Sequence, residues 1–370
     1  MSTLLTVPRL LFGAGCLAAL ADQLAQLGVE RALLISDRGL EAAGVVARTI
    51  EAAPAIAASC LDVPENPTAA GVDLAALAWH ENRCDGIVAL GGGSVLDTAK
   101  IVAALVTSGL GSAAELIGNP ARIGRAVAPL IAIPTTVGTG SDSSPVAAIH
   151  LTVGGPPIGT RDDRLVPLVA LCDPDLARTL PRHLIAATAI DALSHCIEGY
   201  FANSVHPIID ALALDGAARV MADIHAALEP GGDDARASLM VAAFSGGLAI
   251  RKGPGPAHAV ALACGDQHVH HGAVIGVALP HTIRLVTPHV PEKAARLRAA
   301  IGLAADADLG DALETLIGSL GVPTTLGEAG YSIGDHGALV DAMFTSHINR
   351  FSTYAPTAEE YAAVLDRIAG

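Results

Sequence analysis

Five short apolar runs, separated by segments of helix length, constrain the fold of the first half of the chain more than any other feature. None of them shows the polar alternation of a half-exposed strand, so each is predicted to be a strand buried on both faces of a parallel sheet. The runs are RALLISD (31–37), SCLDV (59–63), GIVALGG (86–92), PLIAIPTT (129–136) and VPLVALCD (166–173). They predict a doubly wound α/β domain, in which LTVGGPPIG (151–159) is the turn of a hairpin inserted before the last strand.

After Pro181 the pattern changes to helical periodicity, as in HPIIDALALDGAARVMADIHAALE (206–229). A capping box formed by Thr357 and Glu360 is predicted to open a final helix. Because 370 residues exceed the size of a usual single core, we expect two domains. They are an α/β domain over residues 1–180 and an all-helical domain over residues 181–370, with a ligand cleft between them.

The charge and hydropathy of the chain exclude several classes of partner. The formal net charge of −15 repels phosphate backbones and anionic lipid, so neither nucleic acid nor a membrane surface is expected as a partner. Although 51% of the residues are apolar, every apolar run is interrupted before the roughly 18 residues that a membrane-spanning helix needs. The sequence therefore predicts a soluble protein.

The N-terminus and the cysteines suggest a location. The first residues lack a basic start, and Pro8, Arg9 and Gly13 interrupt the apolar stretch, so no signal peptide is expected. The six cysteines are widely spaced and form no C-x-x-C pair. Reduced thiols in the cytoplasm are the expectation that fits this pattern.

A glycine-rich turn follows the third apolar run, in IVALGGGSVLDTAK (87–100). Gly91, Gly92 and Gly93 let backbone amides approach a phosphate, and the helix that begins near Ser94 would direct its positive dipole end at the same group. The turn is not G-x-G-x-x-G, and a purely structural role remains open.

A second loop, IPTTVGTGSDSS (133–144), follows the fourth run and offers the hydroxyls of Thr135, Thr136, Thr139 and Ser141. Such groups can bond ribose, adenine or phosphate oxygens, or simply close the turn. Asp37 ends the first run, where it could accept bonds from an adenosine ribose and repel a 2′-phosphate, or cap the helix that follows.

The stretch AATAIDALSHCIEGYF (186–201) points to a metal ion. Asp191 and His195 stand four residues apart, so on a helix they share one face. Their neighbours are mostly Ala, Ile and Leu, which would carry the pair into a buried interface where an unpaired carboxylate is costly. A bound cation would relieve that cost.

Five of the fourteen histidines lie in PGPAHAVALACGDQHVHHGAVIGVALPH (254–281). With His258 and His271, the helical pair becomes a set of one carboxylate and three imidazoles, which suits Fe²⁺ or Zn²⁺. His268 and His270 lie in a polar patch and are either solvated loop residues or a route for a proton.

Four motifs together resemble the iron-containing (group III) alcohol dehydrogenase family. In the family's order they are GGGSVLDTAK, PTTVGTGS, DALSHCIEGY and the two-histidine stretch GPGPAHAVALACG…HHGAVIGVALPH. The resemblance implies the dehydroquinate synthase-like fold of that family, with a Rossmann-like N-terminal domain for NAD(P) and a helical metal-binding domain.

Matching this chain to the family motifs implies roles for individual residues. Gly92, Gly93 and Ser94 would hold the pyrophosphate, with Asp97 near the nicotinamide. Thr135, Thr136, Thr139 and Asn66 would line the nucleotide, and Asp37 would favour NAD over NADP. The four implied ligands of Fe²⁺ or Zn²⁺ are Asp191, His195, His258 and His271.

The implied activity is reversible hydride transfer between a primary alcohol and the nicotinamide, so the partner is a small alcohol or aldehyde. The tail HINRFSTYAPTAEEYAAVL (347–365) and the doubled histidine at 270–271 are similar to members that act on 4-hydroxybutyrate. Such a substrate needs a cation for its carboxylate, for which Arg161, Arg164, Arg251 and Lys252 are candidates.

Two departures from the family pattern keep other interpretations open. Many members have a further histidine where this chain has Leu262, and the spacing from Gly265 to His271 is one residue shorter. The alternatives are a maleylacetate reductase-like enzyme, a glycerol dehydrogenase or dehydroquinate synthase-like enzyme, and a non-catalytic nucleotide-binding relative. A homodimer or larger homo-oligomer is expected.

Overall fold

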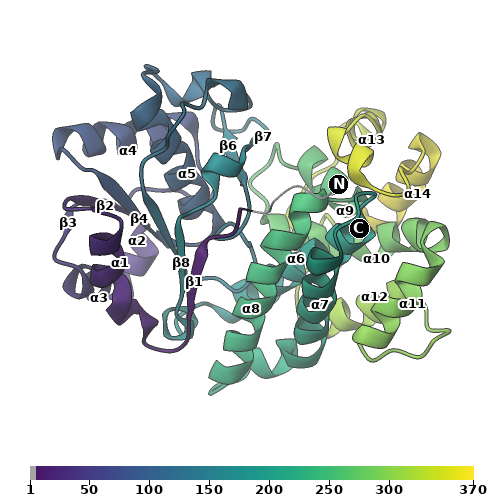
Figure 1. The fold of residues 1–370 in the computed structure, drawn as a ribbon. Helices are drawn as coiled ribbons and strands as arrows, with labels where there is room; N and C mark the ends of the chain where they lie inside the picture. The colour runs from purple at the N-terminus through teal and green to yellow at the C-terminus, as the bar shows by residue number, and fades with distance from the viewer. Residues whose placement is uncertain (1–5) are drawn as a thin grey trace. The chain divides into compact units, whose positions relative to one another are not determined.

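The computed structural model describes residues 6–370, which divide into two compact units (Figure 1). Within the described residues, the α/β unit comprises residues 6–136 and 141–180, and the helical unit comprises Val137–Gly140 and Pro181–Gly370. The α/β and all-helical classes predicted from the sequence are both observed. The assignment of one unit to a dinucleotide and the other to a metal stays a prediction.

The α/β unit is built on a six-stranded parallel sheet with the order β1-β8-β5-β4-β2-β3 (Figure 1). The strands are β1 (Arg9–Phe12), β2 (Ala32–Ile35), β3 (Ile56–Cys60), β4 (Gly86–Gly91), β5 (Leu130–Pro134) and β8 (Val169–Cys172). The central strands β2, β4, β5 and β8 are buried throughout, as their continuous apolar runs predicted.

The two end strands of the sheet differ from the prediction. The sequence did not predict β1, which has four residues and is mostly exposed. Strand β3 begins at Ile56, before the predicted run of 59–63, and its residues alternate between half-buried and exposed. Because the side chains of these end strands are partly exposed to solvent, neither strand needs a continuous apolar run.

Alternate residues of the central strands supply two cores, one on each face of the sheet. Ile87 and Ala89 pack in the core that contains α4 (Ala69–Glu81) and α5 (Gly93–Ser108). Val88 and Leu90 pack in the other core, with α1 (Leu20–Gln26) and α3 (Val45–Ala52). This double burial explains why β4 carries no polar residue.

The predicted hairpin is also observed. Strands β6 (Val146–His150) and β7 (Pro157–Arg161) pair antiparallel, and the turn between them contains Gly154 with a φ of +79°. Glycine adopts this left-handed conformation without the steric penalty that a Cβ atom brings.

The helical unit is all-helical within the described residues. Its α-helices are α6 (Arg182–Phe201), α7 (Pro207–Ala227), α8 (Asp233–Ala249), α9 (Pro256–Ala263), α10 (His271–Val286), α11 (Pro291–Ala300), α12 (Leu309–Ser319), α13 (His336–Phe344) and α14 (Ala358–Ile368). Helix α14 opens with the predicted capping box of Thr357 and Glu360. Helix α6 is buried from Ile185 to Phe201, so its few polar residues lie inside the unit.

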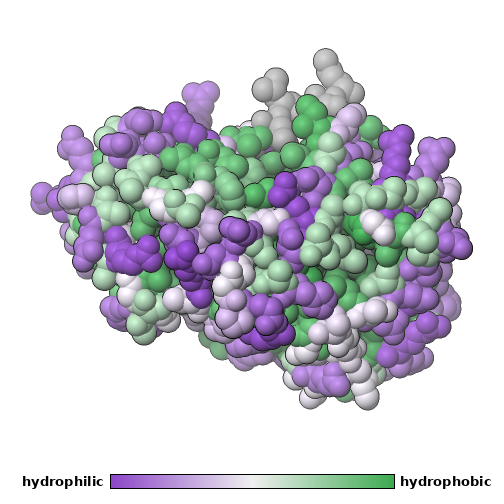
Figure 2. Space-filling model, turned by 90° about the horizontal axis from the view of Figure 1, so that it is seen from below, coloured by the Kyte–Doolittle hydropathy of each residue, from purple (hydrophilic) through white to green (hydrophobic). Residues whose placement is uncertain are grey.

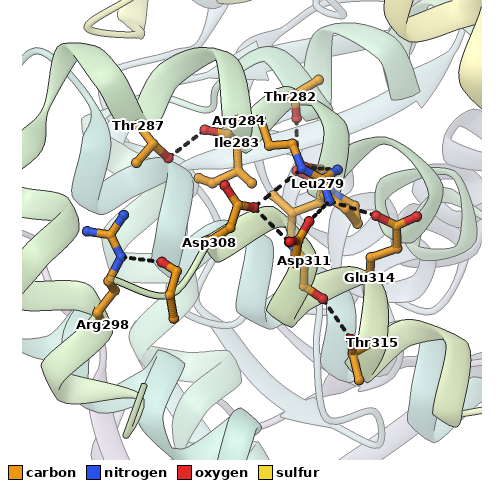
Figure 3. A network of polar contacts seen from close by, with 12 residues as sticks. Leu279, Thr282, Ile283, Arg284, Thr287, Arg298, Asp308, Asp311, Glu314 and Thr315 are labelled. Atoms are coloured by element: carbon orange, nitrogen blue, oxygen red, sulfur yellow. Dashed lines mark hydrogen bonds and ion pairs between the residues drawn. The ribbon is translucent and has the colours of Figure 1, made fainter. Parts of the chain in front are cut away.

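An arginine cluster joins α10 to α12 (Figure 3). The Nη2 atom of Arg284 donates to Asp311 Oδ1 at 2.6 Å and to Glu314 Oε2 at 2.7 Å, and its Nε lies 3.4 Å from Asp308 Oδ1. A side chain on Gly310 would collide with Arg284, since a Cβ atom there would be 2.5 Å from Nε. The cluster connects the last turn of α10, the helix that begins with His271, to α12.

Within residues 6–370, no helix combines the length and apolar character needed to cross a membrane. The face drawn in Figure 2 carries hydrophilic side chains interspersed with apolar ones. All six cysteines have free thiols.

Candidate metal centre

Asp191 and His195 lie one turn apart on α6, inside the helical unit. Their side chains are 8% and 9% exposed, and His195 Nε2 is 3.6 Å from Asp191 Oδ1. The apolar residues around them place this helix face in the interior, as the sequence predicted. A buried carboxylate and a buried imidazole therefore face each other within the reach of one ion.

His258 approaches this pair from α9. Its ring stacks on that of His195, with centroids 5.1 Å apart. One ligand atom from each of Asp191, His195 and His258 lies within 4.8 Å of the others, which is the spacing of groups that can share a metal ion. This trio of residues is hereafter called the buried trio.

The buried trio has polar atoms without hydrogen-bond partners. Among the described residues, Asp191 Oδ1, His195 Nδ1 and His258 Nε2 are buried and accept or donate no hydrogen bond. Such atoms normally cost free energy unless an ion or water satisfies them. One carboxylate oxygen and neutral imidazole nitrogens are donors that Fe²⁺ and Zn²⁺ accept, so the trio fits a divalent metal.

Burial perturbs the titration of the trio. Burial raises the pKa of Asp191, although His271 and His258 partly oppose the change. Burial lowers the pKa of His195 to about 3, helped by His258. Burial also acts to lower the pKa of His258, but the charge and hydrogen bond of Glu198 outweigh it and the pKa is raised. His195 is thus held neutral, the form in which imidazole binds a metal.

His271, the fourth predicted ligand, begins α10 beside the buried trio. Its Nε2 is 3.8 Å from Asp191 Oδ1, and its ring centroid is 5.5 Å from that of His258. Its side chain is 47% exposed, unlike those of the trio. The structure therefore brings all four predicted ligands together, with His271 on the open side of the group.

Glycines permit the close helix approaches that assemble this site. A Cβ atom on Gly272, next to His271, would lie 2.3 Å from the carbonyl oxygen of Ala187 on α6. A Cβ atom on Gly246 of α8 would lie 3.1 Å from the Cβ of His195. Larger residues at these positions would push the neighbouring helix, and the ligand that it carries, away.

Glu198, which was not among the predicted site residues, touches the buried trio through His258. Its side chain is 4% exposed, and its Oε2 bonds His258 Nδ1. Glu198 is three residues after His195 and seven after Asp191, so helical periodicity alone places it on the same face of α6. That spacing was the available signal.

The glycine-rich turn has the geometry predicted for it within the α/β unit. Gly92 is the N-cap of α5, and no side chain caps it. The Ser94 hydroxyl donates to the carbonyl of Glu65. Thr135 is buried, and the buried Oγ1 of Thr136 has no hydrogen-bond partner among the described residues. An unpaired hydroxyl beside an uncapped helix start suits a polar ligand.

The remaining predicted nucleotide residues are placed as follows. Asp37 caps α2 (Arg38–Ala42) by accepting from Leu40 N at 2.9 Å, which is the structural alternative considered for it. Asp97 accepts from Ser141 Oγ at 2.5 Å and from Ala148 N at 2.8 Å. Asn66 and Thr139 are half-buried, and Thr139 belongs to the short segment Val137–Gly140 of the helical unit. Their contacts with a nucleotide stay predictions.

His268 and His270 immediately precede α10, and Leu262 lies on α9. His268 is exposed, whereas the Nδ1 of His270 is buried without a hydrogen-bond partner among the described residues. Leu262 is on α9, one turn after His258, and is half-buried.

Two of the four cations considered for a substrate carboxylate are committed to the protein itself. Arg164 bonds Asp162 at 2.7 Å and the carbonyl oxygens of Ile123 and Gly124. Lys252 bonds Asp210 and is 3.4 Å from the carbonyl oxygen of Tyr200. These contacts argue against a substrate-binding role for either cation.

Comparison with known proteins agrees with this geometry. Residues 8–174 match the iron-containing alcohol dehydrogenase family, and residues 185–368 match the C-terminal part of the Fe-containing alcohol dehydrogenase family. The chain is 37% identical to a 4-hydroxybutyrate dehydrogenase of Cupriavidus necator over 367 residues, which is 95% of this chain and 96% of the relative.

Solved structures show the same fold. A sulfoacetaldehyde reductase from Bifidobacterium kashiwanohense in complex with NAD+ superimposes with a TM-score of 0.90 at 26% identity, covering 100% of this chain and 99% of that one. A 1,3-propanediol oxidoreductase gives 0.90 at 25% identity, covering 100% of both chains. These matches define an alcohol dehydrogenase-type oxidoreductase. The chain belongs to the iron-containing alcohol dehydrogenase family, as its four motifs predicted.

Proposed function

We propose that the chain is a metal-dependent, NAD-linked dehydrogenase that interconverts a primary alcohol and its aldehyde. The observation that carries this proposal is the buried trio, whose three unpaired polar atoms come from Asp191, His195 and His258. His271 completes the proposed ligand set. A divalent ion bound there would supply the positive charge that stabilises a developing alkoxide or polarises a carbonyl.

The residues around the metal centre prepare it for this chemistry. The side chains of Asp191, His195 and His258 are each no more than 9% exposed, so water has little access to these ligands and the local dielectric is low. His271, being half-exposed, lies on the side from which an alcohol can approach. A route for the hydroxyl proton through His270 and His268 completes the proposal, and the buried unpaired Nδ1 of His270 supports it.

We propose NAD rather than NADP as the hydride acceptor. The start of α5 at Gly92 and the unpaired Thr136 hydroxyl would receive the pyrophosphate and its neighbours. Asp37 lies just after β2, and its carboxylate would repel a 2′-phosphate. The sulfoacetaldehyde reductase with the same fold was solved with NAD+.

A short hydroxy acid such as 4-hydroxybutyrate is the proposed substrate. The relative that is 37% identical is a 4-hydroxybutyrate dehydrogenase. Arg161 and Arg251 are the cations to test for its carboxylate. Arg251 is buried in the short helix Ile250–Lys252 of the helical unit.

A cytoplasmic homodimer is the proposed state of the protein. Six free thiols support a reducing compartment. Val7, Leu10, Phe12 and Leu168 are between 44% and 50% exposed, and they cluster at the β1 end of the sheet, where Arg9 N bonds Leu168 O. Burying such side chains in a second copy would remove apolar surface from water. Sedimentation velocity tests the assembly.

The test of the function is NADH formation by protein stripped of metal and reloaded with Fe²⁺ or Zn²⁺. The substrates are 4-hydroxybutyrate, 1-butanol and 1,4-butanediol, which separate the carboxylate from the chain length. His258→Ala should abolish metal-restored turnover, whereas His336→Ala, at an exposed histidine of α13 paired with Asp366, should not.

The outcomes separate the rival functions. Turnover that needs metal and is fastest with 4-hydroxybutyrate supports the proposal. Turnover indifferent to metal and to His258→Ala would indicate a maleylacetate reductase-like enzyme. Binding of NAD and metal without turnover of any alcohol would indicate a non-catalytic relative.

A further inference from the structure

We propose that Glu198 is a positioning residue that fixes His258 in the tautomer and orientation required to bind the metal. The inference rests on the metal site of the proposed function, but not on the identity of the alcohol. Glu198 is buried in α6, and its carboxylate bonds the Nδ1 atom of His258 in α9. It therefore links the helix that carries two ligands to the helix that carries the third.

The carboxylate of Glu198 receives three hydrogen bonds. Gly255 N donates to Oε2 at 2.9 Å, Ala257 N donates to Oε1 at 2.7 Å, and His258 Nδ1 shares Oε2 with Gly255. Gly255 is the N-cap of α9, so the carboxylate sits at the positive end of that helix. A Cβ atom at Gly255 would be 2.8 Å from Glu198 Oε1, so glycine makes room for the carboxylate.

This arrangement determines which nitrogen of His258 carries the proton. A carboxylate that already accepts from two backbone amides can only accept from a third partner, so Nδ1 must donate. In neutral imidazole, the lone pair then resides on Nε2. Nε2 is the buried atom that has no hydrogen-bond partner among the described residues, and His258 has a ligand atom within 4.8 Å of one from each other member of the buried trio.

The spacing of Asp191, His195 and Glu198 along α6 gives a geometric reason for the positioning role of Glu198. Asp191, His195 and Glu198 occupy positions 0, 4 and 7 of one helix face. One buried helix thus holds two ligands and the group that orients another, so the relative placement of three ligands depends on a single rigid element. A carboxylate bonded to a ligating histidine typically raises metal affinity 10–100-fold.

The alternative is that Glu198 only caps α9. Glu198→Gln disturbs both roles, because an amide has one oxygen whereas the three donors use both, and separate measurements of metal binding and of stability tell the roles apart. Affinity for Co²⁺ is measured by competition with a chelator, together with the visible spectrum of the Co²⁺ protein and the thermal unfolding of the metal-free protein. We expect about 10–100-fold weaker Co²⁺ binding and an altered spectrum.

Asp173→Asn is the matched control. Asp173 is fully buried and accepts from Gly15 N, Leu17 N and Asp175 N, but it touches no member of the buried trio. The Asp173→Asn protein should be less stable than the wild type but should bind Co²⁺ with the same affinity. Glu198→Gln protein that loses stability to the same degree but retains wild-type Co²⁺ affinity and spectrum would overturn the proposal.

A second measurement needs no variant. In metal-free wild-type protein with ¹⁵N-labelled histidine, the ring nitrogen shifts of His258, assigned by comparison with His258→Ala, report its tautomer. We expect Nδ1 to be protonated, and a neutral ring whose single proton is on Nε2 would contradict the proposal. Neither measurement uses turnover, so the inference can survive a failure of the proposed substrate or reaction.

Discussion

Asp191 Oδ1 and His195 Nε2 lie 3.6 Å apart on one face of α6, too far for a hydrogen bond and close enough to share an ion. Oδ1 is buried and has no hydrogen-bond partner among the described residues. The metal-free site is therefore electrostatically unfavourable, and its cost should be measurable.

Asp191→Asn tests that cost. Burial raises the pKa of Asp191, which means that the folded state disfavours the anion. A neutral amide removes the cost of burying that anion. At pH well above neutrality, the unfolding free energy of the metal-free variant should therefore equal that of the wild type or exceed it by up to about 1 kcal/mol. The affinity of the variant for Co²⁺ should fall by about 100-fold or more. This loss exceeds the one expected for Glu198, which bonds a ligand rather than the metal. Chemical denaturation in chelator and Co²⁺ competition measure the two effects, and unchanged Co²⁺ affinity would exclude Asp191 as a ligand.

The stability of the metal-free protein should depend on pH through His195, and the direction of this dependence follows from its pKa. Burial lowers its pKa from 6.5 to about 3. As the pH falls below 6.5 the unfolded chain takes up a proton at this residue, whereas the folded protein does not do so until about pH 3. The metal-free protein should therefore lose stability on acidification through this window, by up to about 1.4 kcal/mol per pH unit from His195.

Urea unfolding of metal-free wild type and His195→Asn at several pH values between about 7.5 and 5 measures this slope. The wild-type protein should lose stability more steeply than the variant. His183→Asn, at an exposed histidine of the same helix, is the control and should keep the wild-type slope. Parallel curves for wild type and His195→Asn would contradict the prediction.

The sequence predicted those features of the molecule that depend on residues close together in the chain. The central strands are apolar throughout because both faces are buried, and Asp191 with His195 is visible because one helical turn separates them. Strand β1 was missed because an end strand of four mostly exposed residues resembles a loop.

Glu198 was missed for a different reason. Its partner His258 is 60 residues away in the chain, and a glutamate within an apolar helix does not reveal what it bonds. Only packing of α9 against α6 supplies the three donors around its carboxylate. The same limit applies to Arg164 and Lys252, which the sequence offered as free cations and the fold uses internally.

Lys100 should be a strong determinant of stability in the α/β unit. Its side chain is fully buried, donates to the carbonyl oxygens of Ser144 and Val146 at 3.1 and 2.7 Å, and lies 3.6 Å from Asp97 Oδ1. Lys100→Met would leave the carboxylate without its counter-ion, so we expect a loss of about 3–5 kcal/mol in unfolding free energy.

The Lys100→Met/Asp97→Asn double variant should recover part of this stability, because it also removes the stranded charge. Lys293→Met is the comparison, because Lys293 also bonds two carbonyl oxygens but is only half-buried. The Lys293→Met variant should lose less unfolding free energy than Lys100→Met. Equal losses in Lys100→Met and in the double variant would show that the stranded Asp97 carboxylate adds no cost, which would contradict the prediction.

Gly272→Ala should move a ligand without changing its chemistry. The added Cβ atom would lie 2.3 Å from the carbonyl oxygen of Ala187, so the start of α10 must shift away from α6 and carry His271 with it. We expect a loss of about 1–3 kcal/mol in unfolding free energy from the steric conflict, together with weaker Co²⁺ binding.

Gly318→Ala in α12 is the control, because no atom lies within 4 Å of its added Cβ. That change should stabilise the helix by up to about 1 kcal/mol and leave Co²⁺ binding unchanged. Since the two substitutions are chemically identical, a loss of Co²⁺ affinity confined to Gly272→Ala would trace the effect to the approach of α10 to α6. Wild-type affinity in Gly272→Ala would mean that His271, the most exposed of the four predicted ligands, is dispensable for metal binding.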